Sequence, residues 1–88
     1  MIGSMAFAKE EPSSIKVLSK KRHVLYFKCS GDMIGATIEV ENEEHQSIAT
    51  DQVADTKTIV DFFFLPPGEY TVKVKKGEVE VNIEYINR

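Results

Sequence analysis

From residue 15 onward, apolar and polar residues alternate in short runs, which is the period of β-strands with one buried face. Gly, Pro, Asn and Asp residues separate the runs at intervals of roughly 8–12 residues, as in small sandwich domains. No stretch has the periodicity of a helix. The predicted strands are 15–18, 23–30, 36–41, 47–53, 58–65 and the two strands of a hairpin within 65–85. We therefore predict an all-β fold, an antiparallel, Ig-like β-sandwich of about seven strands, with a small closed barrel as the alternative.

The hairpin is the best-determined part of this pattern. Pro67-Gly68 fits the middle of a tight turn, because proline presets φ and glycine accepts positive φ. If Lys76-Gly77 is the loop, apolar residues face each other on one side of the hairpin and lysines face glutamates on the other. The predicted pairs are Val74 with Val79, Val72 with Val81, Tyr70 with Ile83, Lys75 with Glu78, Lys73 with Glu80 and Thr71 with Asn82.

The other strands differ in how many of their faces are apolar. Both faces of 23–30 are partly apolar, which predicts a central strand with its Leu25, Phe27 and Cys29 face in the core. Apolar and polar residues alternate without a break in strand 36–41, which predicts that Ala36, Ile38 and Val40 point toward the core. The polar strand 47–53 reads as a sheet edge, with Ile48 as its candidate core residue.

Composition limits what such a domain can do. Eighty-eight residues make one domain with one thin core. The net charge is −3, and the only basic run is Lys20-Lys21-Arg22, so we expect no nucleic-acid partner. No hydrophobic stretch approaches the roughly 18 residues of a membrane span. The chain has no nucleophile elbow, P-loop or dinucleotide fingerprint, and we expect neither enzymatic activity nor a cofactor.

Candidate reactive and metal-binding side chains are few. Cys29 is the only cysteine, and its strand context predicts a small buried hydrophobe rather than a reactive thiol. His23 and His45 lack the spacing of a zinc site, and His45 reads as a solvated turn residue. Acidic loop residues meeting at one end of the sandwich would be a route to a calcium site, although no Asp-x-Asp spacing supplies several ligands. These acidic residues are Asp32, Glu43, Glu44, Asp51 and Asp55.

The segment Phe62-Phe63-Phe64 does not fit a strand with one buried face, because three consecutive side chains cannot all point inward. Val60 and Phe62 are predicted in the core, together with either Phe64 or Leu65. Phe63 then points outward. Either a loop or the amino-terminal tail covers it, or Phe62, Phe63 and Phe64 mark a contact surface for a partner protein or for weak self-association.

Residues 1–14 have no strand or helix periodicity and are expected to form a flexible tail before a domain spanning 15–88. Ala6-Phe7-Ala8 followed by Lys9 has the small-x-small pattern of a signal-peptidase site. The tail is then the stub of a signal peptide or a cloning scar, for which Gly3-Ser4-Met5 is suited. Both interpretations favour an exported protein.

The stretch Asp61–Val74 reads Asp-x-x-x-Leu-Pro-x-Gly-x-Tyr-x-Val-x-Val. This pattern resembles an end-strand motif of small secreted β-sandwich domains. It is similar to the carboxy-terminal sorting domain of Bacteroidetes type IX secretion cargo and to a family of small exported Bacteroidetes proteins of unknown function. The similarity extends back through Ala36–Asn42 and forward to Ile83. It implies an extracytoplasmic location and no catalytic residues.

The sequence thus predicts a non-enzymatic, exported protein-interaction or structural module that is monomeric or weakly self-associating. The alternatives are a secretion sorting or attachment domain and a small calcium- or carbohydrate-binding module.

Overall fold

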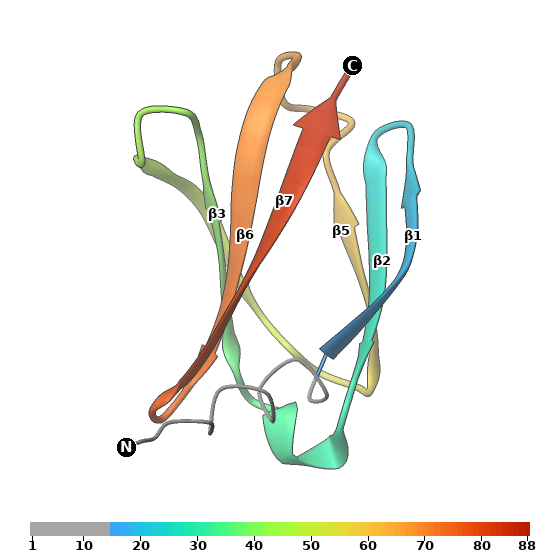
Figure 1. Ribbon diagram of the computed structural model, residues 1–88, viewed down its shortest axis with the longest axis vertical. Helices are drawn as coiled ribbons and strands as arrows, with labels where there is room; N and C mark the ends of the chain where they lie inside the picture. Colours follow the sequence, from blue (N-terminus) through green and yellow to red (C-terminus); the bar gives the residue numbers. More distant parts are fainter. Residues whose placement is uncertain (1–14) are drawn as a thin grey trace, which may run out of the picture.

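The computed structural model describes residues 15–88, which form two antiparallel sheets packed face to face (Figure 1). One sheet has the order β1-β2-β5 and the other the order β4-β3-β6-β7. This arrangement confirms the predicted sandwich over the closed barrel. The strands are β1 (Ile15–Lys21), β2 (Val24–Cys29), β3 (Thr37–Glu41), β4 (Ser47–Gln52), β5 (Lys57–Asp61), β6 (Gly68–Lys76) and β7 (Val79–Asn87), with a short 3-10 helix at Gly31–Met33.

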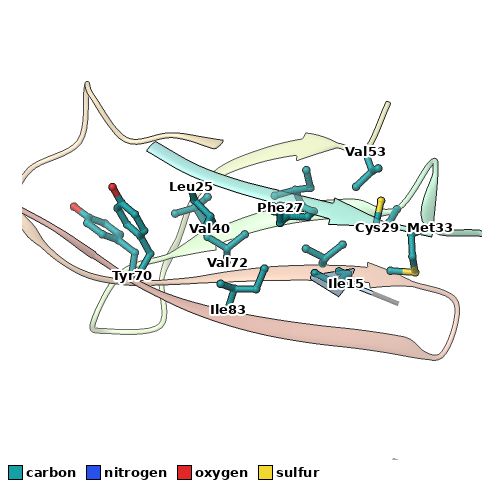
Figure 2. Close-up of a cluster of buried hydrophobic side chains, with 14 of the residues drawn as sticks. Ile15, Leu25, Phe27, Cys29, Met33, Val40, Val53, Tyr70, Val72 and Ile83 are labelled. Carbon is teal, nitrogen blue, oxygen red and sulfur yellow. The ribbon is translucent and has the colours of Figure 1, made fainter. Parts of the chain in front are cut away.

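The core lies between the two sheets and is built by the alternating positions of the strands (Figure 2). Leu25 and Phe27 of β2 point toward Val72 and Ile83 of the opposite sheet, and all four side chains are buried. Both predicted inward faces are confirmed, that of β2 and that of residues 36–40. The remaining buried apolar residues are Ile15, Cys29, Met33, Ala36, Ile38, Val40, Val53, Phe62, Tyr70, Val74 and Tyr85.

The predicted central and edge strands are confirmed, but the ends of two strands and one candidate core residue were wrong. β1 continues to Lys21 instead of ending at residue 18, and β5 ends at Asp61 instead of continuing to residue 65. β2 is the central strand of its sheet, and β4 is an edge.

Ile48, however, does not face the core. The register shifts here, because Glu41 pairs with Ser47 and the buried Val40 pairs with Ala49. Ile48 is therefore the extra, unpaired residue of a bulge, and 39 % of its surface is exposed.

The β6–β7 hairpin forms as predicted, but its register is two residues away from the predicted one. The two-residue loop is Gly77-Glu78, and Lys76 pairs with Val79. Gly77 has φ +60, so it occupies the first central position of the turn, where a primed hairpin turn requires positive φ. A shift of two keeps every side chain on its predicted face. The observed pairs are Lys75 with Glu80, Val74 with Val81, Lys73 with Asn82, Val72 with Ile83, Thr71 with Glu84 and Tyr70 with Tyr85.

Lys73 therefore has a different acidic partner from the predicted Glu80. Its Nζ lies 3.2 Å from Oε2 of Glu41 on the neighbouring strand β3. Glu41 is nearly buried, with 8 % of its surface exposed, and this contact pairs its carboxylate with a cation. The hydrogen bond to Glu41 raises the pKa of Lys73.

The turn before β6 is closed by Tyr70. The Tyr70 hydroxyl donates a hydrogen bond to the carbonyl oxygen of Pro66, four residues upstream, at 2.5 Å. This contact is the tyrosine corner found at the same place in immunoglobulin-like sandwiches. This hydrogen bond explains why residues 65–70 form a turn of defined geometry. The Tyr70 ring lies in the core, and its hydroxyl holds the turn.

We predict that Tyr70→Phe keeps the fold but destabilises it. The variant retains the ring in the core and loses a hydrogen bond worth about 1 kcal/mol. Thermal unfolding should show a melting temperature lower by roughly 4–8 °C. Tyr26→Phe, on the outer face of β2, is the matched control. Equal melting temperatures for Tyr70→Phe and the parent protein would show that the corner contributes nothing.

Candidate partner-contact surface

Phe62 is the residue of the triple-phenylalanine segment that belongs to the core, as predicted. It follows the last residue of β5, and its N–H donates to the carbonyl oxygen of His23 at 2.8 Å, which extends the β2–β5 ladder by one step. Its ring is fully buried and stacks on Tyr85 with the ring centroids 4.1 Å apart. Tyr70 packs against the same ring at 5.5 Å.

Phe63 and Phe64 project from the end of the sandwich. Phe63 is 65 % exposed and Phe64 is 86 % exposed, and their rings meet edge to face at 5.3 Å. The outward direction predicted for Phe63 is confirmed. Of the two candidates for the remaining core position, Leu65 is the one that packs against the core, and Phe64 does not.

A turn at the end of β5 explains this arrangement. The Asp61 carboxylate accepts a hydrogen bond from the N–H of Phe63 at 2.8 Å, and the N–H of Leu65 donates to the carbonyl oxygen of Phe62. An aspartate that bonds the backbone two residues on forms an Asx turn and ends a strand. Because the chain turns here, side-chain alternation stops after Phe63, and Phe64 points away from the core.

The Asn87 side chain fixes this turn to the rest of the domain. Its Nδ2 lies within hydrogen-bond distance of the carbonyl oxygens of Phe62, Leu65 and Pro66, at 3.1, 3.0 and 3.3 Å. Its Oδ1 lies 2.9 Å from Nδ1 of His23. Asn87 is only 2 % exposed, and these contacts satisfy its buried amide.

His23 connects the segment to the β1–β2 turn. Its backbone has φ +67, a left-handed conformation that histidine adopts more readily than most residues. The imidazole contacts the Phe63 ring edge to face at 5.6 Å. The Tyr85 hydroxyl donates a hydrogen bond to the carbonyl oxygen of Lys21 and so holds the same β1–β2 turn. We call His23, Phe63 and Phe64 the aromatic surface.

The role of Asn87 was not predicted, although the residue pattern of β7 contains a signal for it. Alternation from Ile83 through Tyr85 places Asn87 on the inner face of β7, and both Ile83 and Tyr85 are buried. A polar residue at a predicted core position indicates a buried hydrogen-bond network. The identity of its partners depends on how the two turns meet in space.

Cys29 is buried, as predicted, and its Sγ contacts the carbonyl oxygen of Asp55 at 3.8 Å. Burial raises the pKa of the Cys29 thiol, and the nearby charge of Asp55 raises it further. Because the thiolate is the nucleophile, the folded protein holds this group in its unreactive form.

The acidic residues considered for calcium lie at opposite ends of the sandwich. Glu43 and Glu44 belong to the β3–β4 turn, near the aromatic end, whereas Asp32 and Asp55 lie in the connections at the other end (Figure 1). Within residues 15–88, no three His, Cys, Asp or Glu side chains gather in a way that could hold a metal ion. His45 is an exposed turn residue with φ +65. The described part of the chain also contains no helix long and apolar enough to cross a membrane.

Comparison with protein-family models and with curated protein sequences finds no match to this chain.

We predict that Asn87→Ala destabilises the fold by about 2–3 kcal/mol. The substitution leaves a histidine nitrogen and several carbonyl oxygens without their partner near the core, and unpaired buried groups cost about 1–3 kcal/mol each before water enters. Chemical denaturation would measure the change. Asn82→Ala, at an exposed position of the same strand, should change stability by less than about 0.5 kcal/mol. Equal effects of the two substitutions would refute the role of Asn87.

We also predict that Cys29 resists alkylation in the native protein and reacts once the protein unfolds. The folded state holds the thiol proton more tightly than the unfolded chain. The stability that this provides is complete below the unfolded pKa of roughly 8.5 and is lost as the pH rises. Between pH 8 and 10, the melting temperature of the parent should fall more steeply than that of Cys29→Val. Rapid labelling by iodoacetamide at pH 8 without denaturant would contradict the prediction.

Proposed function

We propose that this protein is a non-enzymatic, exported protein-interaction module that binds a partner protein through the aromatic surface. The observation that carries the proposal is the exposure of two adjacent phenylalanines on a turn that is held by hydrogen bonds. Phe62, one residue before them, is fully buried. The same turn therefore combines a core anchor with two apolar side chains presented to solvent.

Rigidity is what makes such a surface suited to binding. Asn87 and Tyr70 hold the carbonyl oxygens of the turn, and Asp61 holds the N–H of Phe63. A partner that covers the two rings therefore orders little additional backbone, and binding loses less entropy than it would on a free loop. Exposed aromatic residues are also frequent among the side chains that contribute most to interface affinity.

The charge next to the aromatic surface indicates the chemistry of the partner. The basic run Lys20-Lys21-Arg22 leads directly into His23, which contacts the Phe63 ring. A complementary partner surface has an apolar centre that covers Phe63 and Phe64 and acidic residues at its rim. Rim charges of opposite sign raise the association rate and exclude basic competitors.

The exported location within this proposal rests on sequence features. They are the small-x-small pattern at Ala6-Phe7-Ala8, which lies outside the described residues, and the similarity of Asp61–Val74 to small secreted β-sandwich domains. Fractionation of cells that express the gene from its own locus would test this part. Recovery in the cytosol alone would contradict export.

The binding proposal is tested by photo-crosslinking from position 64 in an envelope extract, followed by affinity measurement with the purified cross-linked protein. The double variant Phe63→Ser/Phe64→Ser should bind that protein at least roughly thirtyfold more weakly, because a dominant interface aromatic contributes about 2 kcal/mol or more. The matched control is Ile48→Ser, which removes an exposed apolar side chain from the bulge in β4. Unchanged affinity of the double variant would overturn the proposal.

A further inference from the structure

The two sheets differ in width, and in the described part of the chain the difference leaves one strand position empty beside β5. The β1-β2-β5 sheet has three strands, and the opposite sheet has four. On β4, Ala49 pairs with Val40 and Asp51 pairs with Ile38, so Ala49 and Asp51 lie on the inner face of the sheet. All six residues of β4 are nevertheless exposed, because the shorter sheet ends at β5 and does not cover them.

A groove occupies this position. It has a volume of about 240 Å³ and lies between the free edges of β4 and β5. Its lining is mostly apolar but has a charged group on each side, Asp51 on β4 and Asp61 on β5. The lining includes Ile38, Val40, Ala49, Asp51, Val60 and Leu65.

The edge of β5 beside the groove carries unpaired backbone groups. Within the described residues, β5 pairs with β2 alone. Two hydrogen bonds show which opposed residues of β2 and β5 are hydrogen-bonded pairs. The N–H of Cys29 donates to the carbonyl oxygen of Thr56, and the N–H of Phe62 donates to that of His23. These pairs alternate along an antiparallel ladder, so Thr58 and Val60 direct their N–H and C=O groups toward β2. The residues between them direct theirs toward the open side; these are Lys57, Ile59 and Asp61.

We propose that this groove binds an extended segment of a partner protein, which adds a fourth strand to the β1-β2-β5 sheet beside β5. The segment would pair its backbone with Lys57, Ile59 and Asp61. Its alternate side chains, opposite Thr58 and Val60, would enter the apolar groove over Ala49. Strand addition of this kind derives affinity from main-chain hydrogen bonds and specificity from the pockets that receive every second side chain.

The charges along β5 define the sequence of the segment further. Lys57 and Asp61 lie on the outer face at the two ends of the strand, on either side of Ile59. The Asp61 carboxylate uses one oxygen for the N–H of Phe63, which leaves the other available. The segment therefore has apolar residues at alternate positions, a basic residue opposite Asp61 and an acidic or neutral residue opposite Lys57.

The free edges of β1 and β7 fit such a segment less well. β1 is interrupted by a register shift between Val17 and Ser19, and its exposed residues include several lysines. β7 pairs with β6 along its whole length and leaves Glu80, Asn82 and Glu84 on the exposed face. At β5, by contrast, the unpaired edge lies directly beside the groove.

The test is selection of twelve-residue peptides from a random display library against the folded protein, followed by synthesis of the strongest binders. The selected peptides should alternate apolar and polar residues and contain a basic residue. In amide hydrogen exchange by NMR, bound peptide should protect Lys57, Ile59 and Asp61, whereas Thr58 and Val60 change little because they are already paired. Peptides without alternation, or protection without this two-residue period, would overturn the proposal.

Two variants block the site in different ways without removing core contacts. Ile59→Pro removes an N–H that points to the open side, so the ladder to β2 stays complete. Ala49→Trp fills the groove from the exposed face of β4. Each should weaken peptide binding at least tenfold, with Ile59→Val and Ile48→Trp as matched controls that bind like the parent. Circular dichroism confirms folding of each variant. If neither variant weakens peptide binding tenfold, the groove is not the binding site.

This inference is independent of the aromatic surface. Phe63→Ser/Phe64→Ser should bind the selected peptides like the parent protein, and Ile59→Pro should retain the partner captured at position 64. If the double variant still binds the captured partner, the aromatic surface alone has failed. If Ile59→Pro and Ala49→Trp still bind the selected peptides, the groove alone has failed.

Discussion

The contacts of the Asn87 amide are the constraint on which the end of the molecule with the aromatic surface depends. The last residue of β7 reaches back to the turn that follows β5 and, through His23, to the turn that precedes β2. Three segments that are distant in the sequence are thereby held as one unit. A buried amide is costly unless its hydrogen bonds are complete, so this end of the sandwich has one well-defined arrangement. Phe63 and Phe64 owe their fixed, exposed positions to it.

Tyr70 and Tyr85 support the same unit from within the core. Each places its ring against Phe62 and its hydroxyl on a backbone carbonyl of a turn, Tyr70 on Pro66 and Tyr85 on Lys21. Large apolar rings with one polar end are well suited to this position, where the core meets the turns. The hydrophobic packing and the turn geometry are therefore coupled, and a change in one is transmitted to the other.

The unequal width of the sheets is the second feature that shapes the surface. Among residues 15–88, a three-stranded sheet on a four-stranded sheet leaves β4 without cover and β5 without a neighbour on one side. Charged residues at both ends of β5 and its length of five residues limit indiscriminate edge pairing. The aromatic surface and the β4–β5 groove are thus separate consequences of the fold, one arising from a turn and the other from the number of strands.

Much of this fold could be predicted from the sequence because alternation is a local property. The inward positions of Leu25, Phe27, Ile38 and Val40 follow from the period of two. The burial of Cys29 follows for the same reason. The hairpin register could not be predicted from alternation, because a shift of two residues keeps every side chain on the same face and so satisfies the pattern equally well. The position of Gly77 in the turn decided between the two registers. Ile48 was misplaced because an apolar residue on an edge strand has no local signal for its direction.

The sequence by itself determined an all-β sandwich, its approximate strands, its inner faces and the fact that three consecutive phenylalanines could not all be buried. Only the tertiary structure decided that Phe64 is exposed beside Phe63, since that depends on the Asx turn at Asp61 and on Asn87 meeting His23 across the fold. It also decided that β4 joins β3 while β5 joins β2, which creates the groove. The physical reason is common to both: alternation is encoded in neighbouring residues, whereas the partners of turns and edges come from distant parts of the chain.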